Sequence, residues 1–226
     1  MTRSVIVTGG FGVLGQAVAK AFAAAGDKVT RIDFAPSANE PLPDALDIGG
    51  VDLTNAAATQ AALDKVVAAH GGIDVLVNVA GGFTWETLEG GSIGSWAKMQ
   101  SMNLMTAATI TQLALPELKK SASARIVNIG AGAAIKAGMG MGAYAASKSG
   151  VHRLTEALAE ELAGTSVTVN AVLPSIIDTP TNRADMPDAD FSSWVQPGAI
   201  ADVIGFLASD AARSVTGALI PVTRGA

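Results

Sequence analysis

Short apolar runs alternate with longer stretches of helical periodicity along the whole chain. Six of these runs are rich in Val and Ile and are bounded by Gly or Pro, which is typical of buried strands. The predicted strands are 4–9, 28–33, 73–81, 124–130, 166–174 and 217–223, with a weaker seventh at 45–51. The predicted helices between them are 13–25, 54–70, 96–118, 145–163 and 199–209.

This alternation favours an α/β fold. Near-continuous apolar strands separated by helices are typical of a parallel sheet covered on both faces, with right-handed crossovers. No internal repeat or linker divides the chain, so we expect one domain over residues 1–226 with a doubly wound parallel sheet of about seven strands. The least regular segments are 34–50 and 175–197, and we expect the second to be a loop that covers a substrate.

Composition narrows the class of partner. The 226 residues are 49% hydrophobic, which is ample for a core, and the net charge is −5 with no run of Lys or Arg longer than two. This balance argues against a nucleic-acid or anionic-membrane surface and favours a small-molecule partner. The absence of Cys excludes disulfides and thiolate metal sites, and two His leave little for a metal, so no metal is expected.

Localisation is expected to be cytoplasmic. The lack of Cys suits a reducing compartment. Glycines interrupt the N-terminal apolar stretch, which therefore makes a poor signal peptide. No uncharged run approaches the ~20 apolar residues that a bilayer span needs.

A glycine-rich turn, TGGFGVLG, joins the first predicted strand to the first predicted helix, with Gly9, Gly12 and Gly15 at three-residue spacing. Positions without side chains there permit a tight turn and bring a pyrophosphate close to the helix N-terminus, whose free N–H groups favour an anion. The alternative is a purely structural turn. The strand-then-helix context favours a dinucleotide site.

Asp33 closes the second predicted strand, 18 residues after Gly15. A carboxylate there accepts hydrogen bonds from ribose hydroxyls and repels a 2′-phosphate, so NAD is favoured over NADP unless Asp33 is merely a solvated strand end. Arg31 lies on the same strand face, where it either accommodates a phosphate or pairs with Asp33. Asp52 and Leu53 would border the adenine, although Asp52 suits a helix N-cap equally well.

Tyr144 and Lys148 stand one helical turn apart. A cation within reach favours the ionised phenol, which would bring the tyrosine pKa down toward the working range. The lysine can then hold a nicotinamide ribose while the tyrosine passes a proton. The alternative is a chance pair on an exposed helix.

In combination these features resemble the short-chain dehydrogenase/reductase family along essentially the whole chain. The motifs that carry the resemblance are TGGFGVLG, NVAG at 78–81, Asn103, YAASK at 144–148 and LPSIIDTP at 173–180. The resemblance implies a single Rossmann-type domain in which Tyr144 is the acid/base and Lys148 binds the ribose and lowers the tyrosine pKa. It implies that Asn103 supports a proton-relay water, and the alternative is a helix-interior residue that bonds a carbonyl.

The same resemblance implies the cofactor contacts and the assembly. The expected cofactor-binding residues are Gly9, Phe11, Gly12, Val13, Leu14, Gly15, Asp33, Asp52, Leu53, Ala80, Gly81, Gly82, Lys148, Pro174, Ile177 and Thr179. A homodimer or homotetramer is expected, in which 96–118 and 145–163 pack against the same helices of a second subunit.

Two positions depart from the family pattern. Val13 replaces the middle glycine of most single-domain members, and Ala131 stands where the family has its serine, 13 residues before Tyr144. Without that hydroxyl one donor to a substrate carbonyl is missing, a loss of about 2–4 kcal/mol of transition-state stabilisation. Ordinary alcohol oxidation is expected to suffer.

The departure at Ala131 is shared with the dihydropteridine reductases. NVAGGF at 78–83, Ala131 and IDTPTNRADMPDADFSSW at 177–194 are similar to that group, whereas Asn103 and 83–99 are not. A quinonoid dihydropterin is electron-poor and accepts hydride without a serine gripping a carbonyl. Phe83, Trp85 and Trp194 would wall such a flat ring, although aromatic residues belong to a core as often.

The sequence therefore predicts an NAD(H)-dependent oxidoreductase that delivers hydride to a conjugated C=N or quinonoid acceptor, such as quinonoid dihydropterin. One alternative is a general carbonyl or alcohol oxidoreductase of the same family. Another is a nucleotide-sensing protein that lost catalysis together with the serine.

Overall fold

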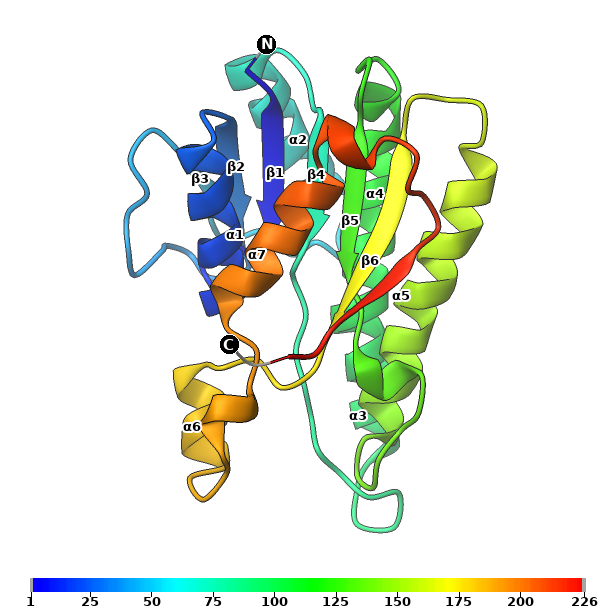
Figure 1. Cartoon of the computed structure of the whole chain (residues 1–226). Helices are drawn as coiled ribbons and strands as arrows, with labels where there is room; N and C mark the ends of the chain where they lie inside the picture. Colours follow the sequence, from blue (N-terminus) through cyan, green and yellow to red (C-terminus); the bar gives the residue numbers. More distant parts are fainter. Residues whose placement is uncertain (1, 225–226) are drawn as a thin grey trace.

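Seven parallel strands form one sheet in the order β3-β2-β1-β4-β5-β6-β7. The computed structural model describes residues 2–224 and places the sheet at the centre of the molecule (Figure 1). The strands are β1 Ser4–Thr8, β2 Lys28–Ile32, β3 Leu46–Ile48, β4 Val75–Asn78, β5 Arg125–Ile129, β6 Thr168–Pro174 and β7 Leu219–Val222. All seven predicted strands are confirmed.

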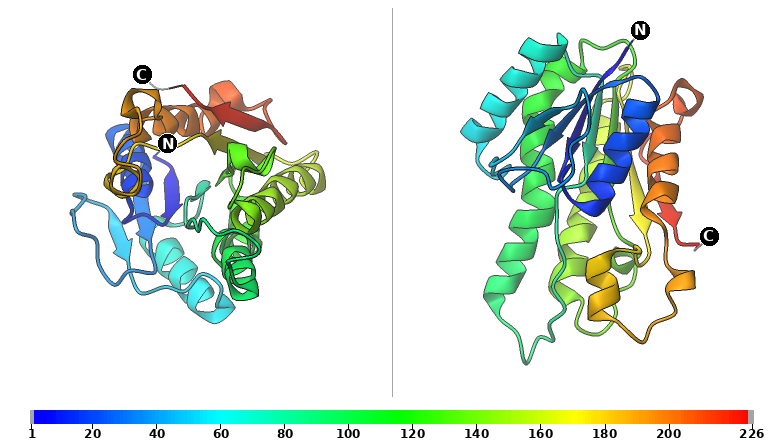
Figure 2. Two further views of the ribbon diagram at one scale, coloured as in Figure 1. Left: turned by 90° about the horizontal axis from the view of Figure 1, so that it is seen from below. Right: turned by 90° about the vertical axis from the view of Figure 1, so that its left-hand side faces the viewer.

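Helices cover both faces of the sheet. On one face lie α1 (Val13–Ala24) and α7 (Pro197–Leu207), and on the other α2 (Ala56–His70), α4 (Thr106–Leu118) and α5 (Gly142–Glu161) (Figures 1 and 2). Because strand side chains alternate, Ile6 of β1 enters the core beneath α2, α4 and α5, while Val5 and Val7 enter the core beneath α1 and α7. The predicted doubly wound α/β domain is confirmed.

The helical stretch predicted at 96–118 is interrupted. It consists of α3 (Ile93–Met99), a π-helical turn η1 (Gln100–Met105) and α4. The π turn contains Asn103 and adds one residue per hydrogen-bonded ring, a feature often found at functional sites. Hydrophobic periodicity cannot reveal such a turn, because its apolar residues stay close to helical spacing.

A short helix lies within the segment that was predicted to be irregular. It is α6 (Pro180–Asp185), and the Thr179 side chain caps it by accepting from the Asn182 N–H at 3.1 Å. A capping Thr followed by Pro at the first helical position is a helix-start signal, so this helix was predictable from the sequence.

The ends of the 175–197 segment are clasped to one another. Ile177 and Val195 form a parallel bridge, in which the Asp178 N–H donates to Val195 O at 2.8 Å and the Val195 N–H to Ile176 O at 2.9 Å. Asp178 also pairs with Arg183 at 2.6 Å, and Arg183 lies over the Phe191 ring at 4.7 Å. The 18-residue stretch from 178 to 195 therefore leaves and rejoins the domain at one place.

The carboxyl ends of the strands meet at the lower edge of the sheet in Figure 1. The chain order reverses between β1 and β4, so the loops that follow these two strands leave a crevice. Seen from below, α6 stands on one side of this edge and the loops before α3 and α5 on the other (Figure 2). Within residues 2–224, no helix has the length and apolar character needed to cross a membrane.

Candidate active site

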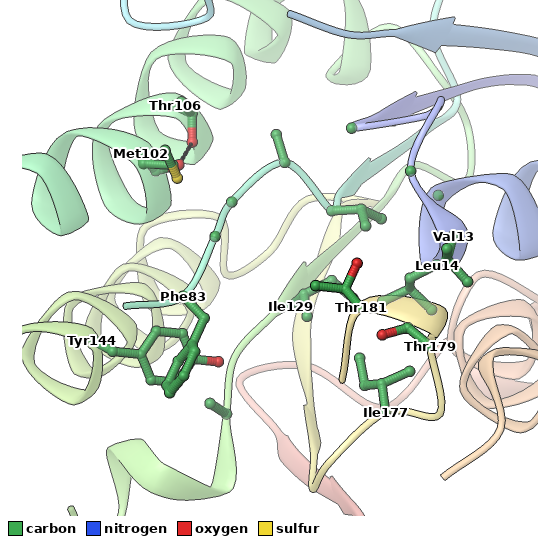
Figure 3. A pocket seen from close by; sticks show the side chains of 18 of the residues that line it. Val13, Leu14, Phe83, Met102, Thr106, Ile129, Tyr144, Ile177, Thr179 and Thr181 are labelled. Atoms are coloured by element: carbon green, nitrogen blue, oxygen red, sulfur yellow. Dashed lines mark hydrogen bonds between the residues drawn. The ribbon is translucent and has the colours of Figure 1, made fainter. Parts of the chain in front are cut away.

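A cleft of about 1780 Å³ opens at the carboxyl edge of the sheet. Every predicted cofactor-binding residue lines it, from Gly9 of the first turn to Thr179 beside α6, and so do Tyr144, Ala131, Phe83 and Trp85. Two predicted site residues, Asn103 and Trp194, are not among its lining residues. Figure 3 shows the wall formed by Phe83 and Tyr144 on one side and by Ile177, Thr179 and Thr181 on the other.

The glycine-rich turn is shaped by close backbone packing. Gly9 has a φ of 60°, and a Cβ there would lie 2.9 Å from the Ala80 backbone. A Cβ on Gly15 would lie 2.1 Å from the Gly9 carbonyl oxygen, whereas one on Gly12 would meet nothing closer than 3.5 Å. Gly9 and Gly15 thus serve the turn, and Gly12 leaves the start of α1 uncovered.

The start of α1 carries no side-chain cap. Val13 and Leu14, its first two residues, line the cleft (Figure 3). Because the first N–H groups of a helix lack intrahelical acceptors, this end of a 12-residue helix suits a phosphate. The residues present therefore fit the pyrophosphate of a dinucleotide.

Asp33 is held in place by the backbone around it. One carboxylate oxygen accepts from the Phe11 N–H and the other from the Ala35 N–H, both at 2.9 Å. Asp33 is thus tied to the glycine-rich turn and lines the cleft beside it.

The predicted pairing of Arg31 with Asp33 is wrong. Arg31 is buried and forms two hydrogen bonds with Asp47 of β3, at 2.7 and 2.6 Å, and two with the Glu40 carbonyl, at 3.2 and 3.3 Å. Its guanidinium also lies over the Phe11 ring at 5.3 Å. Arg31 pairs with Asp47 because Asp47 lies directly across from it in the parallel register of β2 and β3. The guanidinium makes four hydrogen bonds, and Arg31 does not line the cleft.

Asp52 borders the cleft but does not cap α2. It accepts from the Thr54 N–H at 2.9 Å and the Thr54 hydroxyl at 2.7 Å, and these bonds hold the Asp52 pKa below its ordinary value. The N-cap of α2 is Asn55, which accepts from the Ala58 N–H at 3.1 Å. The N-cap interpretation of Asp52 is therefore wrong. Asp52 and Leu53 both line the cleft, and their contact with an adenine stays a prediction.

Tyr144 and Lys148 both face the cleft from the first turns of α5. The phenol ring meets the Phe83 ring edge to face, with centroids 4.9 Å apart and planes at 82° (Figure 3). The Lys148 ammonium donates to the Ile129 carbonyl at 2.8 Å. This carbonyl ends β5, so the lysine ties α5 to the sheet beneath the tyrosine.

Burial sets the protonation of this pair. It raises the pKa of Tyr144 to about 12 and lowers the pKa of Lys148 to about 8. Burial thus moves the Tyr144 pKa away from the working range, opposite to the expected direction, while the Lys148 ammonium is bonded to the Ile129 carbonyl. Near neutral pH the phenol keeps its proton and the lysine remains charged.

Asn103 works behind the cleft wall. Its Oδ1 accepts from the Gly82 N–H at 2.9 Å, and its Nδ2 donates to the Gly82 carbonyl at 3.1 Å and to the Ser147 hydroxyl at 3.0 Å. A Cβ on Gly81 would lie 2.4 Å from Oδ1. The buried amide thus fixes the 80–82 wall, in keeping with the alternative that it bonds a carbonyl, here one outside its own helix.

Ala131 occupies the wall where the family pattern has a serine. The residue is buried and extended, and its N–H donates to Nε2 of His152 at 3.3 Å. His152 was not predicted as a site residue, because no motif includes it. Its spacing of four residues after Lys148 is the only sequence signal for its place on the same helix face.

The predicted aromatic wall is only partly present. Phe83 and Trp85 line the cleft with 52% and 55% of their surfaces exposed. Trp194 is wrongly predicted, since it is buried and packs on Phe191 at a centroid distance of 4.7 Å. Val195 is anchored by its bridge to Ile177, and Trp194 beside it forms the core of its own segment.

Further lining residues were missed. They are mainly apolar side chains and α6 residues: Phe34, Met102, Met141, Ile176, Thr181, Asn182 and Met186. The methionines belong to no motif, and their flexible thioethers adapt to many shapes. In residues 2–224, no group of three His, Asp or Glu side chains is arranged to hold a metal ion.

Comparisons with known proteins agree with this geometry. The family model for short chain dehydrogenase matches residues 3–190. The 3-oxoacyl-[acyl-carrier-protein] reductase FabG of Thermotoga maritima is 32% identical and covers 97% of this chain and 96% of its own. The 2,5-dichloro-2,5-cyclohexadiene-1,4-diol dehydrogenase LinX of Sphingobium indicum is 33% identical, with coverages of 97% and 94%. Ligand-free aldohexose dehydrogenase of Thermoplasma acidophilum superposes with a TM-score of 0.88 at 29% identity, covering 98% of this chain and 92% of that one.

Proposed function

Because the chain belongs to the short-chain dehydrogenase family of oxidoreductases, we propose that it passes hydride from NADH to a flat, conjugated C=N or quinonoid acceptor. Quinonoid dihydropterin is the leading candidate. The observation that carries this proposal is the wall at Ala131, which has no hydroxyl and whose N–H is already bonded to His152. A substrate that needs a carbonyl-gripping donor there finds none, whereas an electron-poor ring does not need one.

The choice of NAD rests on Asp33. Its carboxylate is fixed on the cleft wall by the Phe11 and Ala35 N–H groups, where it suits ribose hydroxyls and disfavours a 2′-phosphate. Arg31, the alternative phosphate ligand predicted from the sequence, is hydrogen-bonded to Asp47 and to the Glu40 carbonyl. The uncapped start of α1 would hold the pyrophosphate.

The bound nicotinamide would supply the hydride. Tyr144 supplies the proton, and its high pKa keeps the phenol in the donating form at neutral pH. Lys148 keeps its charge near pH 7 and would hold the nicotinamide ribose. Asn103 fixes the Gly82 wall, and we propose that it acts through this wall on the position of the water that returns a proton to the tyrosine. A protonated phenol is the form that reduction of the acceptor requires.

The substrate side of the cleft suits a flat ring. Phe83 stands edge-on to Tyr144, and Trp85 and Met141 extend the apolar wall. The 175–197 segment supplies the opposite wall through Ile176 and Met186, and we assign it the covering of the substrate. The LinX relative is named for a substrate with a six-membered unsaturated ring. A protein of similar sequence is therefore named for a ring substrate.

A second candidate is a carbonyl reductase of 3-oxoacyl substrates, which the name of the FabG relative favours. The deciding experiment is a substrate panel. Quinonoid dihydropterin and a 3-oxoacyl thioester are offered as hydride acceptors with NADH or NADPH, and an aldohexose is offered as a hydride donor with NAD or NADP. Fastest turnover of the pterin with NADH supports the proposal, and preference for the thioester overturns it in favour of the second candidate. Tight NADH binding without turnover of any acceptor would favour a nucleotide-sensing protein.

Ala131→Ser sharpens this test. A restored hydroxyl has nothing essential to polarise in a quinonoid ring, so pterin reduction is expected to stay within about three-fold while weak ketone reduction rises. A large gain in pterin turnover would show that the missing serine is a defect. Ala133→Ser, two residues further along the same wall, is the matched control.

A further inference from the structure

His152 is the third residue of a stripe on α5 that begins with Tyr144 and Lys148 at intervals of four residues. The imidazole is buried, and its Nε2 accepts from the Ala131 N–H at 3.3 Å. We infer that His152 is a positioning residue, which holds the Ala131 wall of the substrate site only while its imidazole is neutral. The kinetic part of this inference rests on the proposed reductase function.

The ring is seated directly on the backbone before Ala131. A Cβ on Gly130 would lie 2.5 Å from Nε2 of His152 and 3.2 Å from Leu173, so only glycine allows this approach. The Gly130 N–H donates to Val172 O at 2.8 Å, which joins the same point to β6. The histidine therefore contacts two consecutive residues of the cleft wall.

Lys148 holds the preceding residue of the same segment through the Ile129 carbonyl, at 2.8 Å. Two side chains of one helix face thus fix Ile129, Gly130 and Ala131, and all three of these residues line the cleft. The two side chains bind different backbone groups. The Lys148 ammonium donates to a carbonyl, whereas the His152 imidazole accepts from an N–H.

Accepting an N–H at Nε2 requires a lone pair there. The neutral ring must then carry its proton on Nδ1. An imidazolium has two N–H groups and no acceptor, so protonation sets two donors against each other and removes the hold on Ala131.

The surroundings oppose protonation near neutral pH. Burial, Arg153 and Lys148 lower the pKa of His152, and Glu156 raises it. All three charged groups belong to α5, and Arg153 and Glu156 pair with each other at 2.8 Å. On the β5 side the ring lies against Gly130, which carries no charge. The hold is therefore intact at pH 7 and is lost only as the pH falls below the usual histidine range.

The protonation state can be read without any substrate, because the chain has only two histidines. Nitrogen-15 NMR of the imidazoles, with His70→Gln for assignment, is expected to show His152 with its proton on Nδ1 and an unprotonated Nε2 at pH 7. A proton on Nε2 at pH 7 would overturn the inference. Because this measurement needs no turnover, it decides the inference even where no acceptor of the panel is reduced.

Kinetics then test the positioning role. Wild type is expected to lose kcat/KM for the acceptor as the pH falls and His152 is protonated. His152→Gln keeps an acceptor oxygen that does not titrate, so its kcat/KM should stay within about three-fold of wild type at pH 7 and should not show this acid limb. His152→Leu has no acceptor and should lower kcat/KM about 10-fold at pH 7, mainly through KM, with NADH affinity unchanged. An acid limb that persists in His152→Gln overturns the inference. A fully active His152→Leu overturns the inference as well. Circular dichroism of both variants is the control for folding.

Discussion

Replacing Lys148 by Met is expected to stabilise the folded protein while abolishing turnover. Burial lowers the pKa of Lys148 from 10.5 to about 8, and each pH unit corresponds to about 1.4 kcal/mol. Keeping the ammonium charged at pH 7 therefore disfavours folding by about 3 kcal/mol. Loss of the hydrogen bond to Ile129 offsets about 1 kcal/mol of the gain, which leaves about 2 kcal/mol.

This stabilisation should depend on pH in a defined direction. The folded-state pKa of Lys148 lies below its unfolded value, so between about pH 8 and 10.5 the unfolded chain binds more protons and wild type gains stability as the pH rises. Lys148→Met lacks this gain. The Tm of Lys148→Met should therefore exceed that of wild type by about 4–8 °C at pH 7, and this difference should decline toward pH 10.

The assay is unfolding of the cofactor-free proteins at pH 7, 8, 9 and 10, followed by circular dichroism. Subtracting the free energy of unfolding of wild type from that of the variant removes the contributions of all other titrating groups. Lys65→Met, at an exposed position of α2, is the matched control and should show no pH-dependent difference. An advantage that does not change with pH, or a Lys148→Met protein less stable than wild type at pH 7, would refute the reasoning.

Three further outcomes are expected. Tyr144→Phe should lower kcat by about 10²-fold, the scale of a positioned general acid, with NADH affinity by calorimetry unchanged; full pterin turnover in this variant would remove the tyrosine from the mechanism. Asp33→Ala should narrow a several-fold preference for NADH over NADPH in the same titration, and a wild-type preference for NADPH would contradict the role of the carboxylate. Packing of residues 96–118 and 145–163 against their copies should give a dimer or tetramer, and a monomeric mass by light scattering at micromolar concentration would contradict it.

Local signals were sufficient where one physical requirement dominates a segment. A parallel strand buried on both faces must be apolar along its length, as in Val5, Ile6 and Val7, so the strands could be predicted. The first glycine-rich turn was predictable because its tight backbone contacts exclude side chains at Gly9 and Gly15.

Features that depend on a distant partner could not be predicted. Arg31 pairs with Asp47 because β2 and β3 lie in register, and the residues near Arg31 in the sequence do not indicate this pairing. The tyrosine pKa rises because Tyr144 is buried, a property of the whole fold rather than of the YAASK motif. Trp194 turns out to be core because the bridge of its neighbour Val195 to Ile177 closes its segment upon itself.

The π turn and His152 form a third class of features, for which the sequence carries a signal that is too weak to support a prediction. The spacing that places His152 on the face of Lys148 also fits any solvent-facing or core histidine. Only the contact with the Ala131 N–H distinguishes it.

The clasp at Ile177 and Val195 makes the stretch between them a natural cassette for engineering. Its two ends are hydrogen-bonded neighbours, and its internal contacts, Asp178 with Arg183 and Arg183 with Phe191, travel with it. A stretch of another length could be grafted between the same two anchor points without altering the spacing of β6 and α7. Exchange of this one contiguous piece of gene would replace the cleft residues that it carries, Thr179 and Met186 among them, while the sheet and the glycine-rich turn would stay unchanged.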